Sequence, residues 1–171
     1  MHNSISNIGT CTFCQQTIEH TLMANHFHTC EKKLALEHQA QENLAEDIFL
    51  IQLSVDNLYW LLLEANSSAS LENLNEFLER NWIECCGRIT QVSIQGKNYF
   101  ADQLNNSMGK LLHIGSAFSY EYQSDVAAHI QGKVLTARKG NLPQGLRLAA
   151  RKMIADDQRC LSCQETTHGL P

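Results

Sequence analysis

Two almost uninterrupted apolar runs follow one another along the chain, IFLIQLSV at 48–55 and LYWLLLEA at 58–65. A bilayer span needs about 20 mostly apolar residues, so neither run is long enough to be one. The dipeptide between them, Asp56-Asn57, tolerates the backbone of a tight turn and predicts a β-hairpin. Apolar side chains on both faces of both strands predict a central position in a sheet that is covered on each side.

The segments after this hairpin show helical and strand patterns in turn. Apolar residues spaced three and four apart predict an amphipathic helix over 71–84, with Ser70 as its N-cap. A later run that begins at Pro143 predicts a short helix over 143–157. Alternation of apolar and polar residues predicts strands at 89–96, 117–123 and 129–138. Together these elements indicate an α+β fold, with a compact, mainly antiparallel sheet and two packed helices.

Cysteine and histidine gather between residues 11 and 30 in the spacing Cys-x2-Cys-x11-His-x3-Cys. The four residues are Cys11, Cys14, His26 and Cys30. Two cysteines separated by two residues direct both thiolates at one ion, and residues four apart on a helix share a face. Because Zn²⁺ prefers four tetrahedral nitrogen and sulfur ligands, this set predicts a closed, structural zinc finger. Ile18 and Met23 are the apolar residues expected in its small core.

Other interpretations of this segment are less favoured. His28 lies two residues after His26, so a helix points it away from the ion, and His20 is expected in solvent. A redox CxxC pair typically follows a strand and opens a long helix. No strand is predicted before Cys11, which favours zinc over redox chemistry.

Two further groups of cysteines leave open alternatives. The second CxxC at the C-terminal end can form half of another zinc site, or can close a four-cysteine ribbon with Cys11 and Cys14. The ribbon is less favoured because it leaves His26 and Cys30 without a role. An adjacent pair after the 71–84 helix suggests either a nucleophile, which needs a nearby base, or two buried thiols, and we favour the thiols. The candidates for a second metal site are Cys160, Cys163, His168, Cys85 and Cys86.

Five of the thirteen basic residues lie within fifteen positions of one another in a chain of net charge −5. They are Arg138, Lys139, Arg147, Arg151 and Lys152. Such a group can bind phosphates, although an ordinary solvated surface is the more common explanation. The predicted finger has no lysine or arginine between Glu19 and His28, which disfavours base reading in DNA.

Composition limits the class of protein. Apolar residues make up 43% and charged residues 18% of the 171, as in ordinary globular domains. The N-terminus resembles no signal peptide, so we expect a cytoplasmic protein whose cysteines are ligands or buried thiols rather than disulfides. The expected organisation is a finger over 1–33, a helical connector over 34–47, an α+β domain over 48–158 and a CxxC tail over 159–171.

The order of four segments resembles a known family. YWLLLEA, LENLNEFLERNWIECCG, GSAFSYEYQSD and a terminal CLSC are similar to uncharacterised bacterial and archaeal zinc-finger proteins related to the Ri-plasmid open-reading-frame-three-like family. The resemblance implies a zinc finger in front of an α+β body and a CxxC behind it, but no reaction. The chain departs from the pattern at Arg88, where histidine is usual, and over 123–128, where the usual aspartate, aromatic, glycine and hydroxyl residues are replaced.

The residues therefore predict a cytoplasmic zinc-binding protein that acts through binding, with a protein partner favoured over nucleic acid and no membrane contact. One alternative is a nucleic-acid-binding regulator that uses the basic residues of 138–152. The other is a thiol- or metal-dependent enzyme centred on Cys85 and Cys86. No substrate or partner follows from the sequence.

Overall fold

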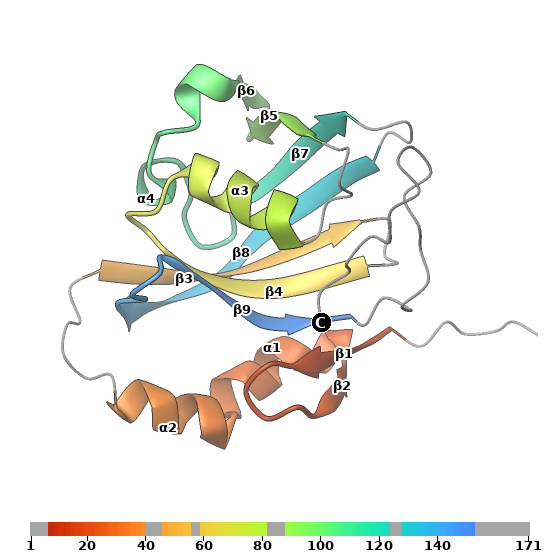
Figure 1. Cartoon of the computed structure of the whole chain (residues 1–171), viewed down its shortest axis with the longest axis vertical. Coiled ribbons are helices and arrows are strands. Elements are labelled where there is room, and N and C mark those ends of the chain that lie inside the picture. The colour runs from red at the N-terminus through yellow and green to blue at the C-terminus, as the bar shows by residue number, and fades with distance from the viewer. Residues whose placement is uncertain (1–6, 40–45, 56–58, 82–87, 124–127, 153–171) are drawn as a thin grey trace, which may run out of the picture.

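The computed structural model of the chain describes residues 7–39, 46–55, 59–81, 88–123 and 128–152. In this part of the chain, nine strands form one sheet in the order β2-β1-β9-β4-β3-β8-β7-β5-β6 (Figure 1). The strands are β1 (Ile8–Cys11), β2 (Thr17–Glu19), β3 (Glu46–Val55), β4 (Tyr59–Asn66), β5 (Arg88–Ile94), β6 (Lys97–Tyr99), β7 (Ala117–Gln123), β8 (Ala128–Gly140) and β9 (Leu146–Arg151). The helices are α1 (His20–Thr29), α2 (Glu31–Gln39), α3 (Leu71–Asn81) and α4 (Met108–Leu111), with a 3₁₀ turn at Ala101–Gln103.

The predicted hairpin of the two apolar runs is confirmed. β3 and β4 pair antiparallel from Ile48 opposite Asn66 to Val55 opposite Tyr59. β3 also pairs with β8, and β4 with β9, so both strands lie inside the sheet. Successive side chains of a strand point to opposite faces, and both faces of this hairpin are buried. Each face has its own hydrophobic core.

The first core lies between the sheet and α3. Leu71, Leu74 and Leu78 of α3 are fully buried against Leu61 and Leu63 of β4 and their neighbours. The predicted N-cap is present, because the Ser70 hydroxyl accepts a hydrogen bond of 3.1 Å from the backbone N–H of Asn73. The side chain of Asn73 in turn accepts a bond from the Ser70 backbone N–H, which closes the cap from both sides.

The second core lies on the opposite face, where α1 and α2 cover the sheet (Figure 1). Trp60 and Leu62 alternate with the first-core residues along β4 and contact Met23 and Phe27 of α1. Met23 was expected in the core of the finger, and it is fully buried, whereas Ile18 is only partly buried. The N-terminal unit, defined here as residues 7–39, is therefore the second cover that the apolar hairpin requires.

The later strands follow the prediction, but the last helix does not. β5, β7 and β8 occupy the expected segments, and β7 pairs with β8 as an antiparallel neighbour. A helix was predicted over 143–157, and this is wrong for Leu146–Arg151, which forms strand β9 between β4 and β1. Hydrogen bonds to the central strand β4 outweigh the helix propensity of the alanines and arginines. The predicted α+β fold is confirmed, and α1 supplies the helical residues of the second core.

Candidate metal centre

The structure brings the four predicted ligand residues together. One ligand atom each from Cys11, Cys14, His26 and Cys30 lies within 4.8 Å of the other three. The Cys14 Sγ and His26 Nε2 atoms are 3.3 Å apart. Ligands of a tetrahedral Zn²⁺ at about 2.3 Å from sulfur stand roughly 3.5–4 Å from one another, so small side-chain movements close this set on one ion.

A tight hairpin places the first two ligands. β1 ends at Cys11, whose backbone N–H donates to Gln16 and whose carbonyl accepts from Gln15. Gln15 has a φ of +63°, the left-handed backbone that turns the chain back into β2. We expected no strand before the CxxC, and this was wrong, because Ile8–Cys11 is paired with both β2 and β9. The strand leads into a hairpin rather than a long helix, which differs from a redox CxxC arrangement.

The loop between the two cysteines is fixed to β9 at an irregularity of the sheet. The register of β4 and β9 shifts between Leu62 and Leu63, and Ala149 is the extra residue. A residue at a β-bulge is left without its strand partner. The Ala149 carbonyl instead accepts hydrogen bonds from Thr12, at 3.0 Å from its backbone N–H and at 2.9 Å from its hydroxyl. The bulge therefore fixes the position of the cysteine loop.

Helix α1 and its end supply the other two ligands. His26 lies in the last turn of α1, and Cys30 caps the helix in an extended conformation before α2 begins at Glu31. Between them, Phe27 is 2% exposed and lies 6.0 Å from the ring of Phe13, centroid to centroid. Phe27 was not predicted as a core residue. Its position four residues after Met23, on the same face of the helix, is the signal that could have identified it.

The thiols have different electrostatic surroundings. Burial raises the pKa of the Cys11 thiol to about 11, so an incoming cation must displace its proton. Burial acts in the same direction on Cys14, but hydrogen bonds from the Gln16 backbone and the Cys11 and Cys30 thiols, with the charge of Lys32, lower its pKa. Of Cys11 and Cys14, Cys14 is thus the thiol that ionises more readily before a metal binds.

His20, which was expected in solvent, is instead partly buried beside the second core. Its ring lies 4.6 Å from that of Trp60, and the Asn7 amide lies 3.4 Å from its Nδ1 atom. The same Asn7 accepts a hydrogen bond of 3.0 Å from the Trp60 indole N–H. Burial, followed by the charge of Lys152, lowers the pKa of His20. This histidine is a packing residue of the N-terminal unit.

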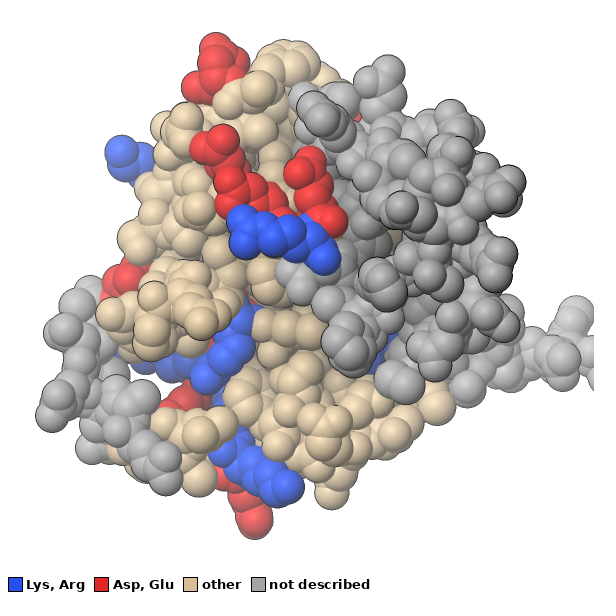
Figure 2. All heavy atoms as spheres, in the orientation of Figure 1, with Lys and Arg blue, Asp and Glu red and all other residues tan. Residues whose placement is uncertain are grey.

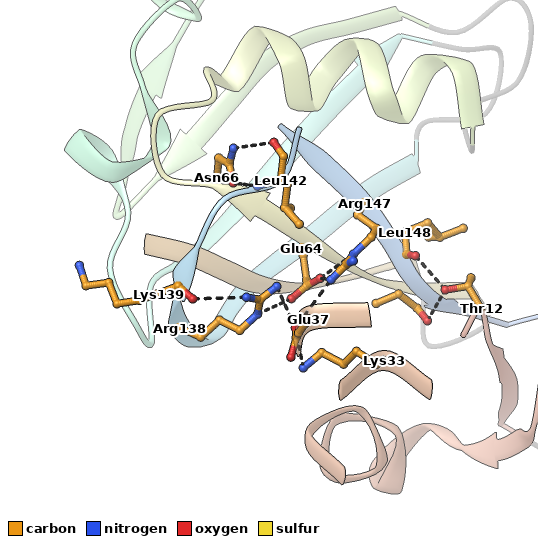
Figure 3. A network of polar contacts seen from close by, with 11 residues as sticks. Thr12, Lys33, Glu37, Glu64, Asn66, Arg138, Lys139, Leu142, Arg147 and Leu148 are labelled. Atoms are coloured by element: carbon orange, nitrogen blue, oxygen red, sulfur yellow. Dashed lines mark hydrogen bonds and ion pairs between the residues drawn. The ribbon is translucent and has the colours of Figure 1, made fainter. Parts of the chain in front are cut away.

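A network of charged side chains joins α2 to the sheet (Figure 3). Glu64 of β4 is 1% exposed and accepts hydrogen bonds of 2.8 Å from both Arg138 and Arg147. Arg138 also contacts Glu37 of α2 at 2.9 Å, and Lys33 of the same helix contacts Glu37 at 3.1 Å. Figure 2 shows basic side chains between α2 and the sheet, and a mixture of acidic and basic side chains over α3. These charges hold α2 against the sheet.

Two cations of this network, Arg147 and Lys33, also contact aromatic residues beside the metal ligands. The Arg147 guanidinium lies 4.9 Å from the ring centre of Phe13, inside the cysteine loop. The Lys33 ammonium lies 4.2 Å from the ring centre of Phe27. Both are cation–π distances, so the charged network and the aromatic residues beside the ligands form one continuous contact. Sequence patterns gave no signal for the contacts of Arg138 and Arg147, since both residues are far in the chain from Phe13, Glu37 and Glu64.

The other predicted site residues are the candidates for a second metal site and the basic group of 138–152. Cys85, Cys86, Cys160, Cys163 and His168 lie outside the described residues. Within the basic group, Arg138 and Arg147 bind carboxylates of the same chain, and Lys139 pairs with Asp47 at 2.9 Å. Phosphate binding by this group stays a prediction.

No family model matches the chain, and no curated protein is significantly similar to it. The crystal structure of MM3350, a protein of unknown function from Methanosarcina mazei Go1, is similar in part. The TM-score is 0.48 at 9% identity, over 57% of this chain and 64% of that one, less than two thirds of its length. Within the described residues, every helix is too short or too polar to cross a bilayer.

Proposed function

We propose that Cys11, Cys14, His26 and Cys30 hold one Zn²⁺ and that the protein is a zinc-dependent binding protein. The observation that carries the proposal is the closed set of three thiols and one imidazole at the edge of the second core, to which Cys11 and Cys30 belong. Such a set leaves no open coordination position for a substrate, which supports a structural ion rather than a catalytic one. The ion would fasten the N-terminal unit to the sheet.

A protein partner is supported by the outer surface of the same unit. Leu22 of α1 is 55% exposed, and Leu36 of α2 is 49% exposed. Large exposed apolar patches mark surfaces that bind other proteins, and we propose that these two leucines belong to one. The phosphate-binding alternative has less support, because the guanidinium groups of Arg138 and Arg147 bind Glu64 and Glu37. We therefore place protein contacts ahead of nucleic acid, and we propose a cytoplasmic location where reduced thiols persist.

Metal content is the first test. Native mass spectrometry of freshly reduced protein should show one zinc per chain, lost on addition of a chelator and absent in Cys30→Ser. The matched control is His28→Gln, which removes an exposed histidine of the same helix and should keep the ion. Protein without zinc under reducing conditions would overturn the proposal and favour redox chemistry at the CxxC pairs.

The binding role needs a second experiment. Zinc-loaded protein and the Leu22→Glu/Leu36→Glu variant should be compared in cross-linking from host-cell extract and in fluorescence anisotropy with labelled single- and double-stranded oligonucleotides. We expect a specific protein cross-link that the variant loses, and no oligonucleotide binding at about 0.15 M salt. Oligonucleotide binding that falls in Arg151→Gln/Lys152→Gln would instead support the nucleic-acid alternative.

A further inference from the structure

The three thiols of the centre differ in their access to solvent. Cys11 and Cys30 are 1% and 3% exposed, whereas Cys14 is partly exposed in the loop after β1. All three sulfur atoms lie within 4.8 Å of one another. A small oxidant that reaches the centre therefore meets Cys14 first, and a second thiol lies close enough to react with the product.

We propose that Cys14 is an oxidation site for hydroperoxides and that its oxidation releases the ion; this rests on the proposed zinc centre. The Cys14 thiolate attacks the outer oxygen of the hydroperoxide, so that an S–O bond forms, the O–O bond breaks and the alcohol or water leaves with a proton. The thiolate of Cys11 or Cys30 then attacks the Cys14 sulfur, which forms a disulfide and expels hydroxide, protonated to water. Two thiols lose two electrons, the peroxide gains them, and Zn²⁺ leaves with its charge unchanged.

Loss of the ion has a consequence for the fold because the ligands are also core residues. Among the described residues, the N-terminal unit contributes four fully buried apolar side chains to the second core, and two of them are ligands. These four are Cys11, Met23, Phe27 and Cys30. A unit with so small a core depends on its metal to stay folded. Oxidation should therefore loosen it and uncover the sheet face formed by Leu50, Trp60 and Leu62.

Trp60 reports this event directly. It is 2% exposed, lies against His20 and donates its indole N–H to Asn7, all contacts to the N-terminal unit. The chain has two tryptophans, and the other, Trp82, lies outside the described residues. The Trp82→Phe variant therefore has Trp60 as its single tryptophan. Exposure of the indole to water shifts its emission to longer wavelength.

The experiment treats zinc-loaded Trp82→Phe protein with hydrogen peroxide. Zinc release is followed with a colorimetric chelator, disulfides are mapped by mass spectrometry after alkylation, and Trp60 emission is recorded in parallel. We expect one zinc released per chain, a disulfide that includes Cys14 and a red shift of Trp60, all reversed by a thiol reductant with added zinc. A disulfide that excludes Cys14, or zinc loss with unchanged Trp60 emission, would overturn the proposal.

Two matched variants distinguish the effect of removing the solvent-accessible thiol from the effect of changing any one metal ligand. Cys14→His and Cys30→His both keep four nitrogen or sulfur ligands, but only the first removes the accessible thiol. We expect Cys14→His to release zinc at least about tenfold more slowly in peroxide, and Cys30→His to remain sensitive. Equal release rates would contradict the proposal. If neither variant retains zinc, the disulfide map of the parent protein decides.

A chelator arm without peroxide distinguishes the two proposals. If the reduced protein holds no zinc before the chelator is added, the proposed function itself is refuted. Protein that loses zinc and shifts its Trp60 emission with the chelator, but keeps its zinc in peroxide, would leave the zinc centre in place and refute only the oxidation site.

Discussion

At the scale of single residues, the buried carboxylate of Glu64 has the largest predicted effect on stability. It is 1% exposed and bonded to two guanidinium groups, so Glu64→Gln leaves Arg138 and Arg147 with Glu37 as the remaining carboxylate of the network. Breaking a buried ion pair in this way costs about 3–5 kcal/mol, and the partial exposure of the arginines places our expectation near the lower end, about 3 kcal/mol. Urea unfolding of the zinc-loaded protein measures the change.

The control for Glu64 is an ion pair on the surface. Glu76 and Arg80 contact each other one turn apart on α3, and both are more than half exposed. Glu76→Gln should change the free energy of unfolding by no more than about 0.5 kcal/mol. Equal effects of the two substitutions would show that the network between α2 and the sheet has no special importance.

His20 gives a prediction about pH. Its Nε2 atom is buried without a hydrogen-bond partner among the described residues, so the charged imidazolium is disfavoured in the folded state. Because the folded pKa is below the ordinary value of 6.5, the stability from neutral His20 is complete above about pH 6.5 and is lost as the pH falls through the folded pKa. An NMR titration, with His20→Gln to assign the ring signals, should give a midpoint below that of the urea-unfolded chain. A midpoint at or above it would contradict this account.

At the scale of elements, the cap of α3 is the contact that the sequence identified best. Ser70→Ala removes the hydroxyl that accepts from the Asn73 backbone N–H, and should lower the free energy of unfolding by about 1 kcal/mol. Ser68→Ala is the control, because Ser68 is exposed and bonds to Glu46 through its backbone N–H. Thermal unfolding of both variants tests the difference, and a loss in Ser68→Ala as large as in Ser70→Ala would argue against the cap.

Strand β1 depends on a close approach that only glycine permits. A Cβ atom on Gly9 would lie 2.4 Å from both the Arg151 carbonyl oxygen and the Trp60 ring, and the backbone oxygen has no room to move. Gly9→Ala should therefore separate β1 from β9 and weaken zinc binding at Cys11, measured by competition with a chelator. Ile8→Ala is the control on the same strand, since Ile8 is 39% exposed. Equal zinc affinities in the two variants would refute the role assigned to Gly9.

The elements that sequence patterns missed share one cause. β9 contains Leu-Arg-Leu-Ala-Ala-Arg, which suits a helix locally, and becomes a strand because β4 and β1 lie on either side of it. β1 has only four residues and one buried glycine, too little for a periodic signal. In both cases hydrogen bonds to strands distant in the chain determine the structure. The ligand spacing was readable because the metal site is local, within residues 11–30.

At the scale of the whole molecule, the apolar runs required two covers, and the sequence identified one of them. The 71–84 pattern predicted the helix on the first face, because its leucines repeat with helical period. The second cover was predicted as a separate finger, since neither Met23 nor Phe27 indicates what it packs against. The charged network and the bulge at Ala149 show why the finger belongs to the sheet. The family resemblance stays a prediction.

Because the two cores lie on opposite faces of the sheet, we expect removal of the metal to destabilise one core more than the other. The ligands lie in the second core only, so a chelator should loosen the N-terminal unit, while α3 keeps the first core closed over Leu61, Leu63 and Val92. Hydrogen exchange followed by mass spectrometry should show faster exchange in α1 and α2 after zinc removal. Peptides from β7 and β8 should keep their protection, and His28→Gln serves as a zinc-retaining control. Uniform loss of protection over the sheet would mean that the two cores unfold as one, with the ion stabilising the whole molecule.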